Sequence, residues 1–131
     1  TVYATHDAAE AMAVAHRVAL MRDGRVVQVG TPQEVYDHPA DLWAARLTGP
    51  AREIDGAAAG VADGPVLVRP EWVEPGEGLD GTVTGVWYRG SHTDVVVETA
   101  AGVVEMRLPG RAAVGRGEET AVRVARWQMV R

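Results

Sequence analysis

Residues 18–29 of this chain read VALMRDGRVVQV, two apolar runs on either side of an Asp-Gly pair. Asp-Gly supplies the positive φ angles of a tight hairpin turn. The stretch therefore predicts two antiparallel strands, over residues 18–21 and 25–29, joined by residues 22–24. This hairpin is the clearest local structure that the sequence predicts.

Helix signals lie on both sides of the hairpin. In each, a residue that favours the helix N-cap is followed three positions later by Glu, which can satisfy free N–H groups of the first turn. The pairs are Asp7 with Glu10 and Thr31 with Glu34. The predicted elements are a short β-type run over 2–5 and helices over 8–16, 32–37 and 40–47. Together with the hairpin they are typical of the closing part of an α/β domain.

The composition and the periodicity of the sequence change near residue 50. From Ala51 onward Gly and Pro are frequent, Val dominates and helical periodicity disappears, so we expect a domain boundary near residues 49–55. Short strands at regular spacing predict a mainly β fold, with a small closed or nearly closed barrel. The predicted strands cover 57–62, 66–69, 81–88, 93–99, 103–108 and 120–126, with 127–130 as a closing edge.

An acidic cluster interrupts these strands. It consists of Glu71, Glu74, Glu77 and Asp80. The cluster lacks the alternation and the central Gly of an EF-hand calcium loop. Because Pro75 and Gly76 lie within it, we expect a solvated loop.

Composition excludes several classes of function. The chain has 131 residues, of which 47% are hydrophobic and 24% charged, as expected of a soluble globular protein. It has no Cys and no Lys, so it offers no disulfide, no cysteine zinc site and no lysine for a G-x-x-x-x-G-K-[ST] phosphate loop. The net charge of −5 argues against nucleic-acid binding and against an anionic membrane surface. Because the sequence starts at Thr1 without Met, we expect a truncated chain.

Catalytic and metal-binding patterns are sparse. Ser91 is the only serine, and its neighbour His92 would point to the opposite face of a strand. We therefore expect a polar turn there and no catalytic dyad. His16, His38 and His92 lack the spacing of metal ligands and are expected at the surface or at helix ends.

The tryptophans allow two interpretations. Trp43, Trp72, Trp87 and Trp127, with Tyr88, could form a base-stacking surface on a barrel. In a chain with no Phe and a single Ile, we favour a role as large fillers of the core and of interfaces.

His6 lies between the β-type run and the first helix, at the carboxyl edge of the expected sheet. Ligands of α/β proteins bind at this edge. An imidazole there can hydrogen-bond a phosphate or an attacking water, since its pKa lies near the working pH. The pattern alone leaves a purely structural role open.

Two groups of motifs resemble known families. Residues 2–12, VYATHDAAEAM, resemble the switch-histidine segment of ABC transporter ATPases, and the likeness continues to residue 39 through the importer motif GTPQEVY. VLVRPE at 66–71, GTV at 81–83 and GRGE at 115–118 resemble the TOBE domain, an OB-like accessory barrel of importer ATPases. The resemblance implies a mainly β fold, an OB-like TOBE barrel over 51–131 preceded by a short α/β remnant of the nucleotide-binding domain over 1–50.

The same resemblance implies a function. The chain would be the C-terminal part of the ATP-hydrolysing subunit of an ABC importer for a small solute of the iron(III), polyamine, phosphonate or sugar type. His6 matches the histidine that contacts the γ-phosphate of ATP and helps to place the attacking water. ATP and Mg²⁺ are implied for the longer parent. Because the other nucleotide motifs lie upstream in the family, no cofactor, no metal and no ATPase activity are expected in this fragment. Ala8 replaces a Gln that is common in the family and leaves the role of His6 intact.

The implied partners are a second copy of the chain, transmembrane permease subunits and a solute-binding protein, with no nucleic acid. The implied location is cytoplasmic, on the inner face of the membrane through the permease. Apolar faces over 2–5 and 11–15 that lack a covering sheet support a homodimer, and the TOBE barrel would brace or regulate the ATPase dimer. The alternative is a stand-alone regulatory module that binds an oxyanion or other small ligand. Its candidate anion contacts are Arg69, Arg89, Arg107 and Arg111.

Overall fold

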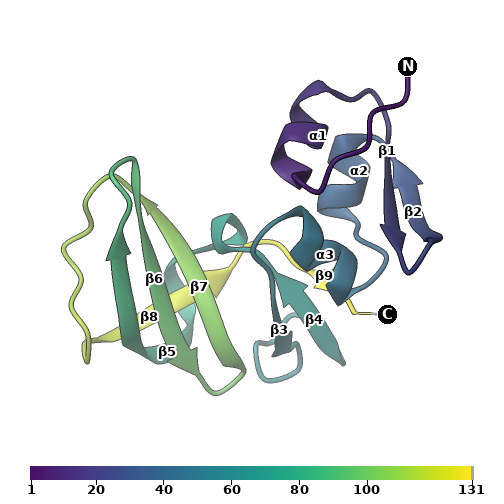
Figure 1. The fold of residues 1–131 in the computed structure, drawn as a ribbon. Helices are drawn as coiled ribbons and strands as arrows, with labels where there is room; N and C mark the ends of the chain where they lie inside the picture. The colour runs from purple at the N-terminus through teal and green to yellow at the C-terminus, as the bar shows by residue number, and fades with distance from the viewer. Residues whose placement is uncertain (131) are drawn as a thin grey trace. The chain divides into compact units, whose positions relative to one another are not determined.

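The structure is a computed structural model that describes residues 1–130. The described residues form two compact units, residues 1–50 and residues 51–130. Figure 1 shows helices and one hairpin in the first unit and a mainly β second unit, which confirms the predicted fold class. Within residues 1–130, no helix combines the length and the apolar character that crossing a membrane requires.

The first unit contains the predicted hairpin. Strands β1 (Val18–Arg22) and β2 (Arg25–Gly30) pair antiparallel. The turn residues Asp23 and Gly24 have φ angles of 52° and 76°, in the left-handed region that an Asp-Gly turn uses. This prediction is therefore confirmed down to the backbone conformation of the turn.

Three short helices surround the hairpin: α1 (Ala8–Val14), α2 (Pro32–Asp37) and α3 (Leu42–Thr48). Each has a side-chain cap at its N-terminus, provided by Asp7, Thr31 and Asp41, and Thr31 forms a complete capping box with Glu34. The predicted starts of the first two helices are confirmed. The third begins at Leu42, two residues later than predicted, because Asp41 accepts a hydrogen bond from the backbone N–H of Ala44 at 2.7 Å and caps the helix.

The strand predicted over residues 2–5 is not formed, and that prediction is wrong. A strand needs a neighbour to take up its backbone N–H and C=O groups, and none of the ladders formed within residues 1–130 includes this segment. Val2 is 97% exposed and takes no part in the core of this unit. The core lies between the hairpin and the helices. This core consists of Val18, Leu20, Val35 and Ala44.

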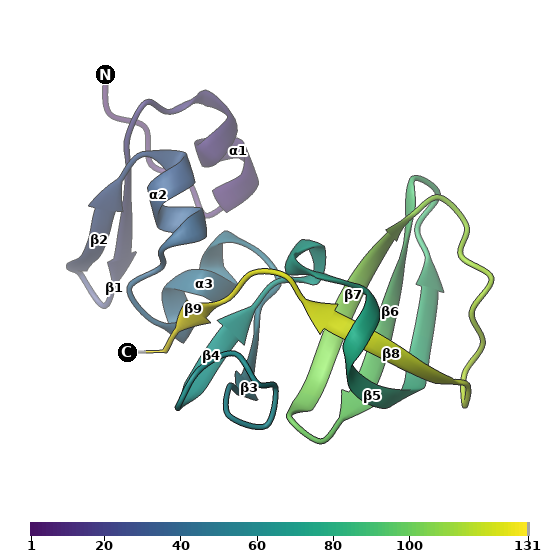
Figure 2. The same ribbon diagram turned by 180° about the vertical axis from the view of Figure 1, so that it is seen from behind.

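The second unit contains two antiparallel sheets, seen from opposite sides in Figure 1 and Figure 2. Their strand orders are β3-β4-β9 and β7-β6-β5-β8. A short 3-10 helix, η1 (Pro70–Trp72), stands between β4 and β5. The strands are β3 (Arg52–Asp55), β4 (Pro65–Val68), β5 (Val73–Tyr88), β6 (His92–Thr99), β7 (Gly102–Pro109), β8 (Glu119–Val124) and β9 (Gln128–Met129).

The core of this unit lies between the two sheets. Ile54, Val66 and Val68 from the smaller sheet belong to one buried cluster with residues of the larger sheet, such as Val97 and Val104. The predicted closure of the barrel is not observed, because the ladders of residues 1–130 remain two separate sheets. The 3-10 helix interrupts the chain between them, and its proline has no N–H to extend a ladder.

The strand predicted over residues 57–62 is wrong. These residues form a turn, in which Asp55 accepts hydrogen bonds from the backbone N–H groups of Ala57 and Ala58 at 2.9 and 3.2 Å. An Asp side chain that captures following N–H groups favours a turn over a ladder. The strand of this region lies just before the turn, as β3.

The acidic cluster also differs from its prediction. Instead of a solvated loop, most of it belongs to β5, which pairs with β8 on both sides of an irregularity. Pro75 and Leu79 both pair with Val122, so the residues between them bulge out of the ladder. Exposed carboxylates therefore sit on a strand that Leu79 and Val122 anchor in the core.

A long connection joins β7 to β8 and is tied to the sheet at both ends. At its start, the Thr93 hydroxyl donates to the carbonyl of Gly110 at 2.7 Å and accepts from the N–H of Ala112 at 3.2 Å. At its end, the backbone of Val83 exchanges hydrogen bonds with Gly117 and Glu118, at 2.8 and 2.9 Å. Thr93 is buried, and these two bonds satisfy its hydroxyl there.

Candidate functional site

His6 lies at the entrance to α1, one residue before the cap Asp7. The Thr5 hydroxyl accepts a hydrogen bond from the N–H of Asp7 at 3.0 Å, and Asp7 in turn caps the helix by accepting from the N–H of Glu10 at 3.1 Å. Tyr3 donates to the Glu10 carboxylate at 2.7 Å, a bond that raises the pKa of Tyr3. The backbone around His6 is thus fixed, while its side chain is exposed.

Three of the four arginines predicted as anion contacts gather at one end of the larger sheet. Arg89 donates from Nε to Asp94 Oδ2 at 3.1 Å, and Arg107 donates from Nε to Asp94 Oδ1 at 3.0 Å. The guanidinium of Arg111 lies over the ring of Tyr88, 5.1 Å from its centre. The register of β5, β6 and β7 places Trp87, Asp94 and Arg107 side by side on one face of the sheet. Tyr88 pairs with Thr93, so Tyr88 and the Arg111 guanidinium above it belong to the other face.

Asp94 organises this arginine group. Burial of its carboxyl raises the pKa, but hydrogen bonds from Arg107 and Arg89, with the nearby charges of Arg107 and His92, outweigh burial and hold the pKa of Asp94 below its ordinary value. The carboxylate is therefore ionised at neutral pH and fixes both guanidinium groups. Sequence reasoning missed Asp94, although its place opposite Trp87 on one strand and Arg107 on the other follows from the hairpin register.

Arg69, the fourth predicted anion contact, does not join the others. It is fully buried, and its guanidinium lies 5.7 Å from the ring centre of Trp72. Arg126 approaches the same ring at 4.8 Å. Arg69 therefore belongs to the packing around Trp72, away from the solvent that would deliver an anion.

The prediction that Ser91 and His92 point apart is wrong. The Ser91 hydroxyl lies 2.9 Å from Nδ1 of His92. Ser91 belongs to the turn after β5, where the alternation of a strand does not apply, and Gly90 there has a φ of 88°. Nε2 of His92 lies 3.6 Å from Asp94, so the pair is an extension of the arginine group. Within residues 1–130 no three His, Asp or Glu side chains are placed to share a metal ion.

The favoured interpretation of the tryptophans as core fillers holds for only some of them. Trp72 is a core residue, whereas Trp87 and Trp127 are 48% and 37% exposed. Trp43 packs at the edge of the first unit's core, beneath the guanidinium of Arg22 at 4.8 Å. The role as core filler therefore holds for Trp72 and does not explain Trp87.

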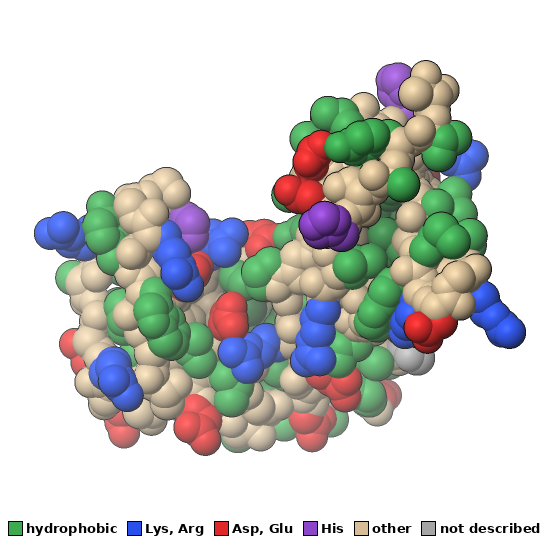
Figure 3. Space-filling model, in the orientation of Figure 1, with side chains coloured by type: hydrophobic (Ala, Val, Ile, Leu, Met, Phe, Trp, Pro, Cys, Tyr) green, Lys and Arg blue, Asp and Glu red, His purple; other side chains and the backbone are tan. Residues whose placement is uncertain are grey.

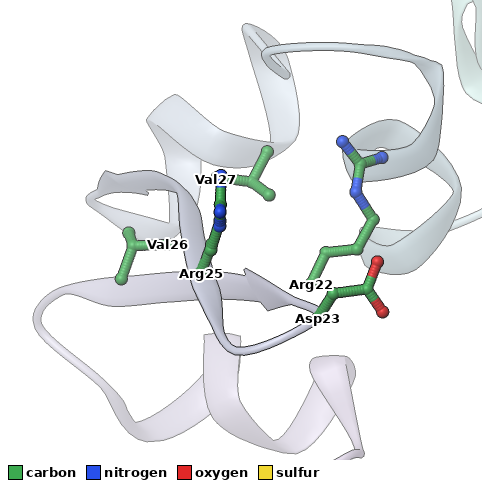
Figure 4. A pocket seen from close by; sticks show the side chains of 5 residues that line it. All are labelled: Arg22, Asp23, Arg25, Val26 and Val27. Carbon is green, nitrogen blue, oxygen red and sulfur yellow. The ribbon is translucent and has the colours of Figure 1, made fainter.

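An open hollow lies at the turn of the hairpin in the first unit, and Figure 4 shows its lining. Arg22 is occupied by an ion pair with Asp41 at 3.6 Å and by its stacking on Trp43. The residues that line the hollow include no nucleophile and no set of metal ligands. The hollow is therefore a weaker candidate for a binding site than the arginine group around Asp94. Its lining residues are Arg22, Asp23, Arg25, Val26 and Val27.

Comparison with known proteins adds a family signal to this geometry. Residues 66–130 match the family described as TOBE domain. An Fe(3+) ions import ATP-binding protein of Rhodococcus jostii is 36% identical over 150 residues, which cover 95% of this chain and 43% of that protein. An Fe(3+) ions import ATP-binding protein of Streptomyces coelicolor is 42% identical over 111 residues, covering 70% of this chain and 32% of that protein.

The names of other relatives differ in their solute. A spermidine/putrescine import ATP-binding protein of Oleidesulfovibrio alaskensis is 49% identical over 55 residues, covering 42% of this chain and 15% of that protein. The chain spans less than half the length of each of these three relatives.

Proposed function

Because this chain belongs to the ATP-binding proteins of ABC importers and carries their TOBE domain, we propose that it is the C-terminal part of an ATP-hydrolysing importer subunit. Residues 1–50 are the end of the nucleotide-binding domain, and residues 51–131 are the TOBE domain. The observation that carries the proposal is the match to one importer protein over 95% of the chain. An unrelated barrel attached to an unrelated helical segment would not give such a continuous match.

His6 is the residue through which this chain acts on ATP. Its exposed imidazole stands ahead of a rigidly capped helix, so it can meet a nucleotide without disturbing the fold. Phosphoryl transfer depends on positioning and on charge stabilisation. An imidazole can donate a hydrogen bond to a phosphate oxygen and orient a water molecule.

We propose that this chain holds neither Mg²⁺ nor ATP by itself. The chain has no Lys for the phosphates, and no metal-ligand cluster occurs in the described part of the chain. We place the remaining nucleotide contacts in the portion of the relatives that this chain does not match, and we derive no step through the metal.

The decisive experiment compares ATP hydrolysis by the intact gene product with that of two variants. His6→Ala should lower kcat by about 100-fold, the usual contribution of a positioned acid–base group, while ATP binding persists. His16→Ala is the matched control, since His16 is also exposed and lies just beyond the same helix. Full activity of His6→Ala, or no hydrolysis by the intact product, would contradict the proposal. Residues 1–131 alone should show neither turnover nor ATP binding.

For the solute we propose iron(III). The relatives that cover 95% and 70% of the chain are both named as Fe(3+) importers, whereas the polyamine relative matches a shorter stretch. Deleting the gene should abolish high-affinity uptake of radioactive iron and leave spermidine uptake unchanged. The reverse outcome would assign the polyamine.

We further propose that the parent works as a homodimer, on the inner face of the membrane, with permease subunits and a solute-binding protein. Exposed apolar side chains in the first unit, such as Val2, Tyr3 and Val14, support association. Light scattering of the purified chain at micromolar concentration should give the mass of a dimer, and a monomer mass would refute this expectation. The TOBE domain braces that dimer.

A further inference from the structure

An exposed patch of aromatic and basic side chains covers the end of the larger sheet where β5 turns into β6. Trp87 is 48% exposed, which is unusual for such a large ring. Figure 3 shows basic and histidine side chains gathered over this end of the second unit. We call this surface the hairpin-end patch, and it consists of Trp87, Arg89 and Arg107 around Asp94.

The guanidinium groups of the patch are oriented but only partly used. A guanidinium carries five N–H donors, and Asp94 takes the Nε–H of Arg89 and the Nε–H of Arg107, one on each carboxylate oxygen. Within residues 1–130, the terminal amino groups of these two arginines make no hydrogen bond. They are therefore held in place with free donors for an acceptor from outside.

The indole of Trp87 is also held in place. It lies against the backbone of Gly85, two residues earlier on the same strand, where a Cβ atom would overlap the ring. Gly85 is buried beneath the ring, and the other side of the indole faces solvent. A large aromatic surface is thus ordered in advance, which lowers the entropy cost of binding a partner.

Charge separates this patch from the rest of its unit. Residues 51–130 hold eight arginines and twelve acidic residues, so the unit has a net charge of −4 with His neutral. The patch with Asp94 has two arginines and one carboxylate, a net charge of +1. Trp, Tyr and Arg are the residues most enriched at protein-binding hot spots.

We propose that the hairpin-end patch is a docking surface for an acidic segment of a protein partner. Carboxylates of the partner accept hydrogen bonds from the terminal amino groups of Arg89 and Arg107, and an apolar side chain of the partner packs on Trp87. A protein segment fits better than a nucleic acid because it can place an apolar side chain beside a few carboxylates, which matches one aromatic ring and two guanidinium groups. A nucleic acid brings a phosphate at every nucleotide, and two arginines on an acidic chain neutralise few of them. This inference goes beyond the proposed ATPase function and does not depend on it.

The test uses the 131-residue chain labelled with ¹⁵N and an acetylated nonapeptide of three Glu-Glu-Leu repeats. NMR signals of the Trp87 indole N–H and of the Nε–H groups of Arg89 and Arg107 should shift together on titration. R107Q should weaken binding about tenfold. R116Q is the matched control, since Arg116 is an exposed arginine of the same unit outside the patch, and it should bind as the parent chain does.

A second variant separates the aromatic contribution from charge. Gly85→Ala forces the Trp87 ring away without altering any charge, so it should also weaken binding of the peptide. Dispersed spectra of each variant establish that the fold persists.

Several outcomes would overturn the proposal. Equal effects of R107Q and R116Q would mean general charge attraction. Inorganic phosphate that shifts the same signals at the same affinity would make the patch a small-anion site. Binding to phosphatidylglycerol vesicles in preference to the peptide would make it a lipid surface. None of these readings involves ATP, so failure here is distinct from failure of the ATPase proposal.

Discussion

Replacing Val104 by Ala tests how the two sheets of the second unit form their core. Val104 lies in β7, is completely buried and pairs with Val97 of β6. The substitution removes two methyl groups, worth about 0.8 kcal/mol each on transfer from water, and leaves a cavity that adds to this cost. We expect a loss of about 2 to 3 kcal/mol in the free energy of unfolding of this unit.

Amide hydrogen exchange along β6 measures this loss locally, so unfolding of the other unit does not obscure it. A loss of about 2 kcal/mol should speed exchange roughly 30-fold where exchange reports global opening of the unit. Val103→Ala is the control, because Val103 precedes Val104 on the same strand but is only half-buried. Its effect should stay below about 1 kcal/mol. Equal effects of the two variants would refute the assignment of the inward face of β7.

Three further outcomes follow from local contacts. Thr31→Ala should cost about 1 kcal/mol in the stability of α2 by removing its capping box, measured by amide exchange, whereas Thr31→Ser should restore it. The pKa of Asp94 in the folded chain lies below its ordinary value of 3.8, so its stabilisation is present above that value and is lost as pH falls through the folded pKa. Urea midpoints should therefore drop in acid below about pH 4, and Asp94→Asn should flatten the drop. Gly81→Ala should destabilise by about 1 to 3 kcal/mol in urea unfolding, since its Cβ would lie 2.6 Å from Val97 Cγ1. Gly64→Ala should be near neutral, since its Cβ would meet only Met129 Cε, at an ordinary contact distance of 3.7 Å.

Sequence reasoning succeeded where short-range rules determine the structure. The Asp-Gly turn and the caps at Asp7 and Thr31 depend on residues within four positions of one another, and each formed as predicted. The strands over 93–99 and 103–108 were also recovered within one or two residues, because their Val-rich alternation matches a half-buried ladder.

The errors arise where distant partners or side-chain competition decide. Residues 2–5 have strand-like composition but no neighbour, so no ladder forms. Asp55 captures the N–H groups that a strand over 57–62 would need. Pro75 and Gly76 led to the prediction of a loop, although pairing with β8 extends the strand through this segment.

The candidate site shows the same limit. The predicted arginines were chosen by type alone. Arg89 and Arg107 converge on Asp94, while Arg111 stacks on Tyr88 and Arg69 is buried elsewhere. The residue that organises the convergence, Asp94, carries no local motif. Its role depends on strand register, which brings Arg107 opposite to it on β7.

The connection between β7 and β8 offers a site where this chain tolerates a change of length. The hydroxyl of Thr93 fastens its beginning and the backbone of Val83 fastens its end, so the residues between are a closed loop on a fixed base. Adding residues to a loop whose ends are already fixed costs little, since the entropy of closure grows only with the logarithm of length. Segments inserted at 113–115 can therefore lengthen this loop and leave the sheets unchanged.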